Sequence, residues 1–191
     1  MIKLLGVARN TPEGIEVRVH PMLIPERHPL ASVNDSFNAV FVHGDAVDDA
    51  MFYGRGAGEL PTASAVVGDI FDIARNLQYE CCGRISCTCY KQLPIKAMDD
   101  ICSKYFLRML VENEPGVLAA VTAVFGDRKV SIEQIIQKKK IGELAEIVVI
   151  TEKVKERHVK DSLKAFEEMT AVKKVSSVIR VYGAVSYTHL R

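Results

Sequence analysis

The sequence contains no tryptophan, and aromatic residues make up only 7% of its 191 positions. It has no excess of either charge, because 25 basic and 24 acidic side chains leave a formal net charge of +1. That balance gives no electrostatic reason to expect a nucleic acid or an anionic membrane as partner. The sequence also lacks an apolar run of membrane-spanning length and a secretory signal. We therefore expect a cytoplasmic, globular protein of one or two domains.

Cysteine is scarce and confined to one region of the chain. The five cysteines are Cys81, Cys82, Cys87, Cys89 and Cys102. In a cytosolic chain we expect them to be mostly reduced thiols. Structural zinc sites separate paired cysteines by roughly two to four residues, whereas the run CCGRISCTC contains only C-C and C-x-C pairs. The spacing favours a cysteine-rich connector, and we expect no metal site.

The most informative stretch is a short strand-like MFY followed by glycines at alternate positions, Gly54, Gly56 and Gly58. Pro61 then opens a segment with apolar residues at helical spacing, so the stretch predicts a strand, a glycine loop and a helix start. The dinucleotide fingerprint G-x-G-x-x-G is absent, since its last place, counted from Gly54, falls on Glu59. The residues alone leave two alternatives open, a ligand-binding loop and a tight strand-to-helix connection.

The remainder of the first half predicts a small sheet with one helix. Residues 15–20 alternate, with Ile15, Val17 and Val19 on one face and Glu16, Arg18 and His20 on the other, as in a half-buried strand. Two further strands, adjacent and antiparallel, are expected in 37–45 and 50–56. The helix after Pro61 should end near Asn76 and pack its apolar face against this sheet. No recognisable catalytic arrangement surrounds a histidine, which favours structural roles for His20, His28 and His43.

The second half has a more regular pattern. Its expected elements are a strand at 105–111, a helix at 117–128, strands at 132–138 and 145–151 joined by 138–144, a helix at 154–169 and a strand at 175–182. The order β-α-β-β-α-β is that of a ferredoxin-like domain. The three lysines at 138–140 have no interleaved aromatic residues, so we expect a solvated hairpin end there rather than a nucleic-acid patch. The fold class expected for the whole chain is α+β.

Two long stretches resemble a known family. Residues 17–76, which include VRVHPMLIPERHPL and MFYGRGAGELPTASAVV, resemble the C-terminal part of the homoserine dehydrogenase catalytic region. Residues 105–182, with the core NEPGVLAAVTAVFGDRKVSIEQI, resemble the ACT regulatory domain that many bacterial members carry behind it. We expect a catalytic-domain portion at 1–90 with a mixed or antiparallel sheet, a linker at 91–104 and an ACT domain at 105–183. The end, 184–191, includes VSYTHLR, which resembles a translated sequencing adapter and is left out of the fold.

The resemblance implies NAD(P)-dependent interconversion of L-homoserine and L-aspartate 4-semialdehyde, in the biosynthesis of threonine, methionine and isoleucine. It implies NADP or NAD as cofactor, homoserine as substrate and a homo-oligomer. The family's nucleotide-binding half and its catalytic Lys and Asp have no counterpart in this sequence. We therefore expect a truncated copy, inactive by itself, with no catalytic residues of its own. The alternative function is an amino-acid-binding ACT module without catalytic activity.

The same resemblance assigns a cofactor contact to the glycine loop. Gly56, Ala57 and Gly58 match the place where the family brings bare backbone against the nicotinamide end of the cofactor. Gly58 is the strongest candidate, because a side chain there would push the ring away.

A second set of candidates lies in the ACT-like half. ACT domains commonly bind amino acids where the loop after the first strand meets the start of the second strand, often at a dimer interface. Asn113, Gly116 and Ser131 occupy those places. The resemblance implies an amino-acid effector, with threonine expected, because an Asn amide and free loop amides can satisfy its polar groups.

Overall fold

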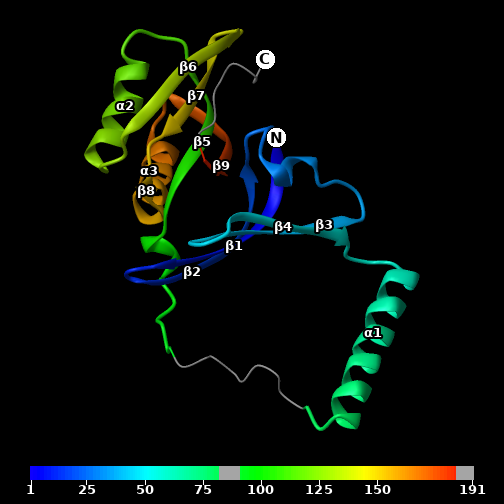
Figure 1. Cartoon of the computed structure of the whole chain (residues 1–191). Coiled ribbons are helices and arrows are strands. Elements are labelled where there is room, and N and C mark those ends of the chain that lie inside the picture. The colour runs from blue at the N-terminus through cyan, green and yellow to red at the C-terminus, as the bar shows by residue number, and fades with distance from the viewer. Residues whose placement is uncertain (82–90, 184–191) are drawn as a thin grey trace. The chain divides into compact units, whose positions relative to one another are not determined.

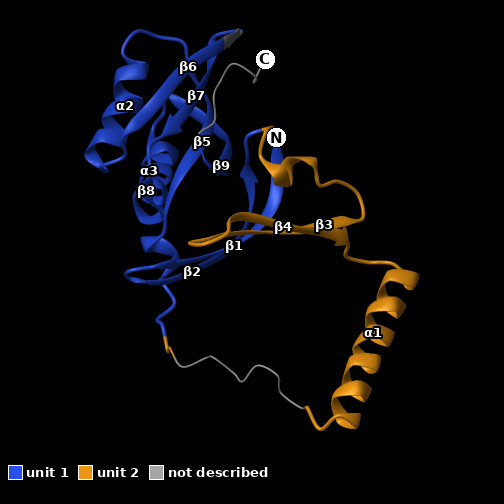
Figure 2. Cartoon of the chain, in the orientation of Figure 1, with its two compact units in different colours: residues 1–25, 93–191 blue, residues 26–92 orange. Residues whose placement is uncertain are grey.

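The computed structural model describes residues 1–81 and 91–183 of the chain (Figure 1). The chain divides into two compact units, coloured separately in Figure 2. The larger unit consists of residues 1–25 and 93–191, and the smaller unit consists of residues 26–92. The larger unit therefore joins the first two strands to the ACT-like half, whereas the sequence analysis places those strands in a catalytic-domain portion at 1–90.

The larger unit is built on one mixed sheet. Its strands are β1 (Ile2–Thr11), β2 (Gly14–Leu23), β5 (Cys102–Glu112), β6 (Ile132–Ile141), β7 (Leu144–Thr151), β8 (Val154–Lys155) and β9 (Val172–Val181), and its helices are α2 (Val117–Asp127), α3 (Glu156–Glu168) and the 3-10 helix η2 (Met98–Asp100). The strand order is β1-β2-β9-β5-β7-β6, and the short β8 pairs with β5. The segment from β5 to β9 confirms the predicted β-α-β-β-α-β layout and the α+β class.

The core lies between the sheet and the helices α2 and α3. Alternate residues of β5 are fully buried, namely Tyr105, Leu107, Met109 and Val111. This period of two places every second side chain of the strand under the helices. From the helices come Phe125 and Phe166, whose rings meet edge to face with centroids 5.0 Å apart. Burial of each ring contributes about 2 kcal/mol, so this pair fixes α2 against α3.

In the β1–β2 hairpin, the buried face of β2 carries Glu16 and Arg18. Val17 and Val19 are 51% and 63% exposed, whereas Glu16 and Arg18 are 4% and 5% exposed. The alternation therefore predicted the strand correctly but not which face is buried. Glu16 and Arg18 can be buried because they hydrogen-bond each other at 3.1 Å, so neither charge is left without a partner.

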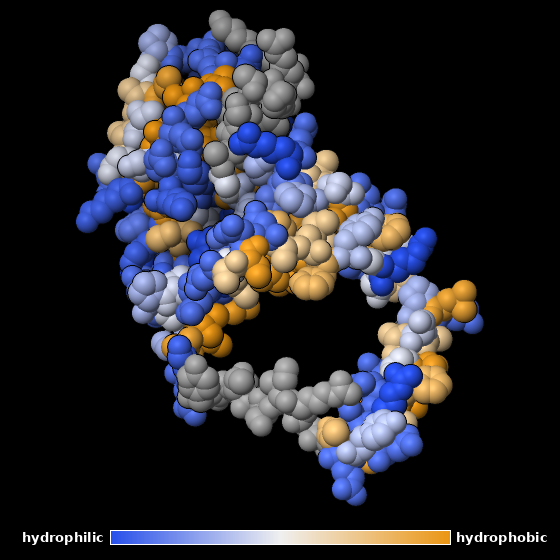
Figure 3. Space-filling view, viewed as in Figure 1, coloured by the Kyte–Doolittle hydropathy of each residue, from blue (hydrophilic) through white to orange (hydrophobic). Residues whose placement is uncertain are grey.

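The smaller unit contains the 3-10 helix η1 (Pro29–Ser32), the strands β3 (Phe37–Gly44) and β4 (Asp48–Arg55) and the helix α1 (Glu59–Gln78). β3 and β4 pair antiparallel, which confirms the predicted hairpin. α1 begins two residues before Pro61, and none of its residues is buried. The expectation that its apolar face packs against the hairpin is therefore wrong for this chain. Figure 3 shows hydrophobic residues exposed along this helix.

Other expectations concern the β6–β7 turn, the cysteines, the end of the chain, metals and membranes. The β6–β7 connection is only Gly142 and Glu143, because both strands extend further than the sequence indicated. Three of the cysteines, in 82–90, and the final residues 184–191 lie outside the described residues. In the part that is described, no group of His, Cys, Asp and Glu could hold a metal ion. No helix there is long and apolar enough to cross a membrane.

Candidate functional site

The glycine loop joins β4 to α1 through backbone that only glycine adopts readily. Gly58 caps α1 with φ of 134° and ψ of 150°, a region in which L residues are strained. Gly56 is constrained by space instead, since a Cβ built on it would lie 1.8 Å from Nδ2 of Asn38. Gly54 has neither a positive φ nor a close neighbour, since nothing lies within 4 Å of its Cβ position. Gly58 is therefore the glycine that the backbone requires, while a side chain at Gly56 would first have to displace that of Asn38.

Contacts with β3 support this loop from one side. Arg55 donates from Nη1 to Oγ of Ser36 at 3.0 Å, and its guanidinium lies 4.9 Å from the centre of the Phe37 ring. Phe37 in turn stacks on Tyr53, with centroids 4.9 Å apart and planes 7° from parallel. The loop residues themselves, including Ala57, are exposed. The loop is thus exposed and held by the hairpin, and the exposed carboxylate of Glu59 follows Gly58 directly.

A histidine–carboxylate pair lies at the far end of the same hairpin and was missed from the sequence. His43 Nδ1 is 2.8 Å from Oδ1 of Asp49, because the antiparallel register places the two residues opposite each other. The hydrogen bond to Asp49 and its charge raise the pKa of His43. Both side chains are more than half exposed. Asp49 lies outside the predicted strands 37–45 and 50–56, so only the observed register, with its turn at 45–47, pairs it with His43.

Two of the effector candidates lie at one end of β5. Asn113 donates its backbone N–H to the carbonyl of Glu143 at 3.0 Å, and its Oδ1 accepts from Nε2 of Gln137 at 3.1 Å. Gly116 caps α2 with φ of 91°, and nothing lies within 4 Å of the position of a Cβ there. These residues form an exposed loop with one anchored amide side chain, a suitable wall for a small polar ligand.

Ser131 does not join them within one chain. Its carbonyl accepts from the N–H of Glu152 at 2.9 Å, just beyond the end of β7 where Thr151 pairs with Ile132. The loop with Asn113 lies at the other end of β7, near Leu144. Seven residues of strand separate these ends, about 23 Å at a rise of roughly 3.3 Å per residue. A site that uses all three residues needs a second copy of the chain.

A buried polar cluster behind the sheet was also missed. Glu156, at the start of α3, accepts a hydrogen bond from the hydroxyl of Tyr105 and pairs with Arg180 of β9 at 2.5 Å. Burial raises the pKa of Tyr105, and the hydrogen bond to Glu156 raises it further. Burial also raises the pKa of Glu156, but the bonds from Arg180 and Tyr105 outweigh it and leave that pKa lowered. Nothing in the sequence signals this cluster, since its members are far apart in the chain.

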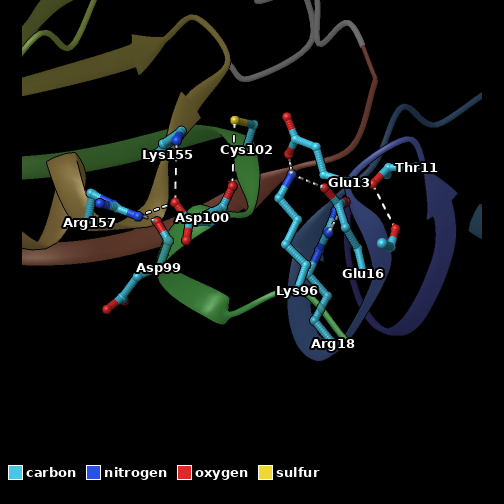
Figure 4. Close-up of polar contacts among 11 residues, drawn as sticks. Thr11, Glu13, Glu16, Arg18, Lys96, Asp99, Asp100, Cys102, Lys155 and Arg157 are labelled. Atoms are coloured by element: carbon cyan, nitrogen blue, oxygen red, sulfur yellow. Dashed lines mark hydrogen bonds and ion pairs between the residues drawn. The ribbon is translucent and has the colours of Figure 1, made fainter. Parts of the chain in front are cut away.

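Charged contacts also hold the connection before β5 to the larger unit (Figure 4). Lys96 reaches Glu13 at 2.7 Å and Glu16 at 3.4 Å, which ties it to the β1–β2 hairpin. Asp100, in η2, pairs with Lys155 at 3.3 Å and with Arg157 at the start of α3. The connection is thus attached to both parts of the unit.

Comparisons with known proteins agree with the resemblance seen in the sequence. The homoserine dehydrogenase family model matches residues 1–71, and the ACT domain model matches residues 105–170. A homoserine dehydrogenase from Neisseria gonorrhoeae is 45% identical, covering 94% of this chain and 43% of the relative. One from Bacillus subtilis is 40% identical, with 95% and 42% covered. The chain belongs to the homoserine dehydrogenase family. It corresponds to the C-terminal part of its members, with an ACT domain.

A solved structure supports the homoserine dehydrogenase assignment in three dimensions. The crystal structure of a homoserine dehydrogenase from Thiobacillus denitrificans superposes with a TM-score of 0.84 at 39% identity. It covers 95% of this chain, whereas the chain covers 42% of it. This chain thus spans less than half the length of the homoserine dehydrogenases that it matches.

Proposed function

We propose that the chain supplies the C-terminal part of an NAD(P)-dependent homoserine dehydrogenase, which interconverts L-homoserine and L-aspartate 4-semialdehyde in amino-acid biosynthesis. The observation that carries the proposal is the match over 94% of the chain, at 45% identity, to a relative of that name. In this proposal the chain is inactive alone, because it corresponds to only 43% of that relative. A cytoplasmic location and the choice between NADP and NAD stay predictions.

The glycine loop is proposed to support the nicotinamide end of the cofactor. Gly58 adopts a conformation that L residues rarely adopt, and a side chain at Gly56 would collide with that of Asn38 as it lies in this structure. Backbone held this closely can bring a ring to hydride-transfer distance, where a displacement of about 1 Å costs roughly a hundredfold in rate. The exposed face of the loop leaves room for such a ligand.

An amino-acid effector, threonine in this proposal, binds the ACT domain across two copies of the chain. β6 is an edge strand of the sheet, so its free hydrogen-bonding groups can pair with β6 of a second copy. End-to-end antiparallel pairing of the two β6 strands would place Ser131 of one copy level with Gly142 of the other, next to Glu143, which accepts the backbone hydrogen bond of Asn113. This arrangement accounts for the distance between the two residues within one chain. We propose a homodimer on that basis.

The experiment is a chimera in which this chain replaces the matching C-terminal segment of the N. gonorrhoeae relative. NADPH oxidation by the chimera is measured with aspartate 4-semialdehyde, and then with threonine added. Turnover by the chimera, with none by the 191-residue chain alone, is the expected result. A folded chimera without turnover, beside an active parent enzyme, contradicts the dehydrogenase proposal. Threonine binding by an inactive chimera would favour the regulatory module instead.

A further inference from the structure

A cavity of about 440 Å³ in the larger unit has basic side chains in its wall. Arg9 comes from β1, Arg18 from β2, Lys104 from β5, and Lys153 from the connection between β7 and β8. Among the described residues that line the cavity there is no carboxylate. The volume lies within the range of small-molecule sites, so the cavity is large enough for a metabolite.

Two buried polar atoms of the wall have no hydrogen-bond partner in the described part of the chain. Arg18 donates from Nη1 to Glu16, but its Nε is unpaired, although the side chain is only 3% exposed. Oγ of Ser103 is also unpaired, in a residue that is 5% exposed. An unpaired buried polar group costs about 1–3 kcal/mol, and such groups often mark a bound ion or water. Both residues line the same cavity.

The charges of the wall are only partly balanced. Glu16 offsets Arg18, and Lys104 pairs with Glu133 at 2.5 Å and more loosely with Glu152 at 3.7 Å. Arg9 and Lys153, in contrast, form no ion pair with any residue from 1–81 or 91–183. Two exposed positive charges therefore remain available at the cavity.

We propose that this cavity binds a small phosphorylated ligand through its phosphate group. A phosphate monoester carries a charge of about −1.5 to −2 near pH 7 and three acceptor oxygens, which matches two unbalanced cations and two unused donors. Arg9 and Lys153 supply the charge, while Nε of Arg18 and Oγ of Ser103 donate hydrogen bonds. The guanidinium group suits phosphate because its N–H groups are fixed in a plane. The site lies at the end of β5 away from Asn113 and does not rest on the dehydrogenase proposal.

The test is calorimetric titration of the 191-residue chain with inorganic phosphate and with glycerol phosphate. Sodium chloride at equal ionic strength and uncharged glycerol are the control ligands. The variants are Arg9→Gln and Lys153→Gln, both at exposed positions, and Ser103→Ala, which removes an unpaired hydroxyl. Lys164→Gln, at an exposed position on α3 outside the cavity, is the matched control.

Each of the two charge variants should weaken phosphate binding about threefold to tenfold. Ser103→Ala should weaken it while leaving the thermal midpoint of the free protein unchanged or higher, and Lys164→Gln should bind as the parent does. Absence of binding to both phosphate ligands overturns the proposal. Binding that is equally strong in Arg9→Gln, Lys153→Gln and Lys164→Gln, or that sodium chloride reproduces, also overturns it.

Discussion

Glu156 and Arg180 form a partly buried ion pair, 2.5 Å long, that joins the start of α3 to the strand β9. The same carboxylate accepts the hydrogen bond of Tyr105, so one side chain connects three elements of the ACT domain. Buried charges cost free energy unless every one of them has partners. Loss of Glu156 should therefore affect the whole domain.

Replacement of Glu156 by Ala should lower the free energy of unfolding by about 3 kcal/mol, because it leaves Arg180 and the Tyr105 hydroxyl without their acceptor. Glu156→Gln keeps an acceptor oxygen and should cost less. The measurement is urea denaturation followed by circular dichroism. The control is Lys160→Ala, which breaks an exposed pair with Asp99 and should change stability little, because solvent screens an exposed ion pair. Equal effects of Glu156→Ala and Lys160→Ala would contradict the assigned role.

The free energy of unfolding should depend on pH because Glu156 titrates. Its folded pKa lies below the ordinary value of 4.5, so its contribution is present above that pH and is lost as pH falls through the folded pKa. Urea midpoints measured between about pH 6 and pH 3 should fall with acidification. Glu156→Gln has no titrating carboxylate and should show a shallower fall. If the urea midpoints of parent and variant fell equally with pH, Glu156 would not be the source of the pH dependence.

Gly58→Ala should damage the proposed cofactor loop. A side chain at φ of 134° costs about 1–3 kcal/mol of strain, so the loop should shift. In the active chimera, the apparent KM for NADPH should rise at least several-fold. The matched control is Gly68→Ala in α1, where nothing lies within 4 Å of the Cβ position and helix propensity favours Ala. An unchanged KM in Gly58→Ala would rule out the contact.

The two-copy effector site makes a prediction about mixed dimers. Asn113→Ala and Ser131→Ala should each abolish most threonine binding, because in a dimer of either single variant every site lacks one of the two residues. Dimers refolded from an equal mixture should contain some sites with both walls intact, and calorimetry should show partial recovery of the binding stoichiometry. A site within one chain would show no recovery on mixing. Gln137→Ala should weaken binding less than Asn113→Ala, since Gln137 only anchors the Asn113 side chain.

The exposed apolar stripe of α1 should cause self-association of the isolated chain. Val66, Ile70 and Phe71 are 52%, 59% and 60% exposed and recur at helical spacing. Sedimentation velocity should show species that grow with protein concentration. Ile70→Lys should reduce them, whereas Ala65→Lys, at the opposite side of the same helix by its 100° spacing, should not. If the Ile70→Lys variant associated as strongly as the parent, another surface would be responsible for the association.

The sequence by itself determined several features that depend on neighbours along the chain. Period-two alternation predicted β2, helical spacing predicted α2 and α3, and the glycines at 56 and 58 marked the strand-to-helix turn. The order of these elements was sufficient to predict the ferredoxin-like layout of the second half, because consecutive elements in such a unit pack in few ways.

The tertiary structure alone decided which residues meet. Alternation in β2 is symmetric, so only its contacts in the larger unit show that Glu16 and Arg18 are buried while Val17 is exposed. The separation of Asn113 from Ser131 follows from strand register, and the cluster of Tyr105 with Glu156 follows from packing between distant segments. Each of these depends on pairings across many residues, and the energy of such pairings is set by geometry that local sequence does not contain.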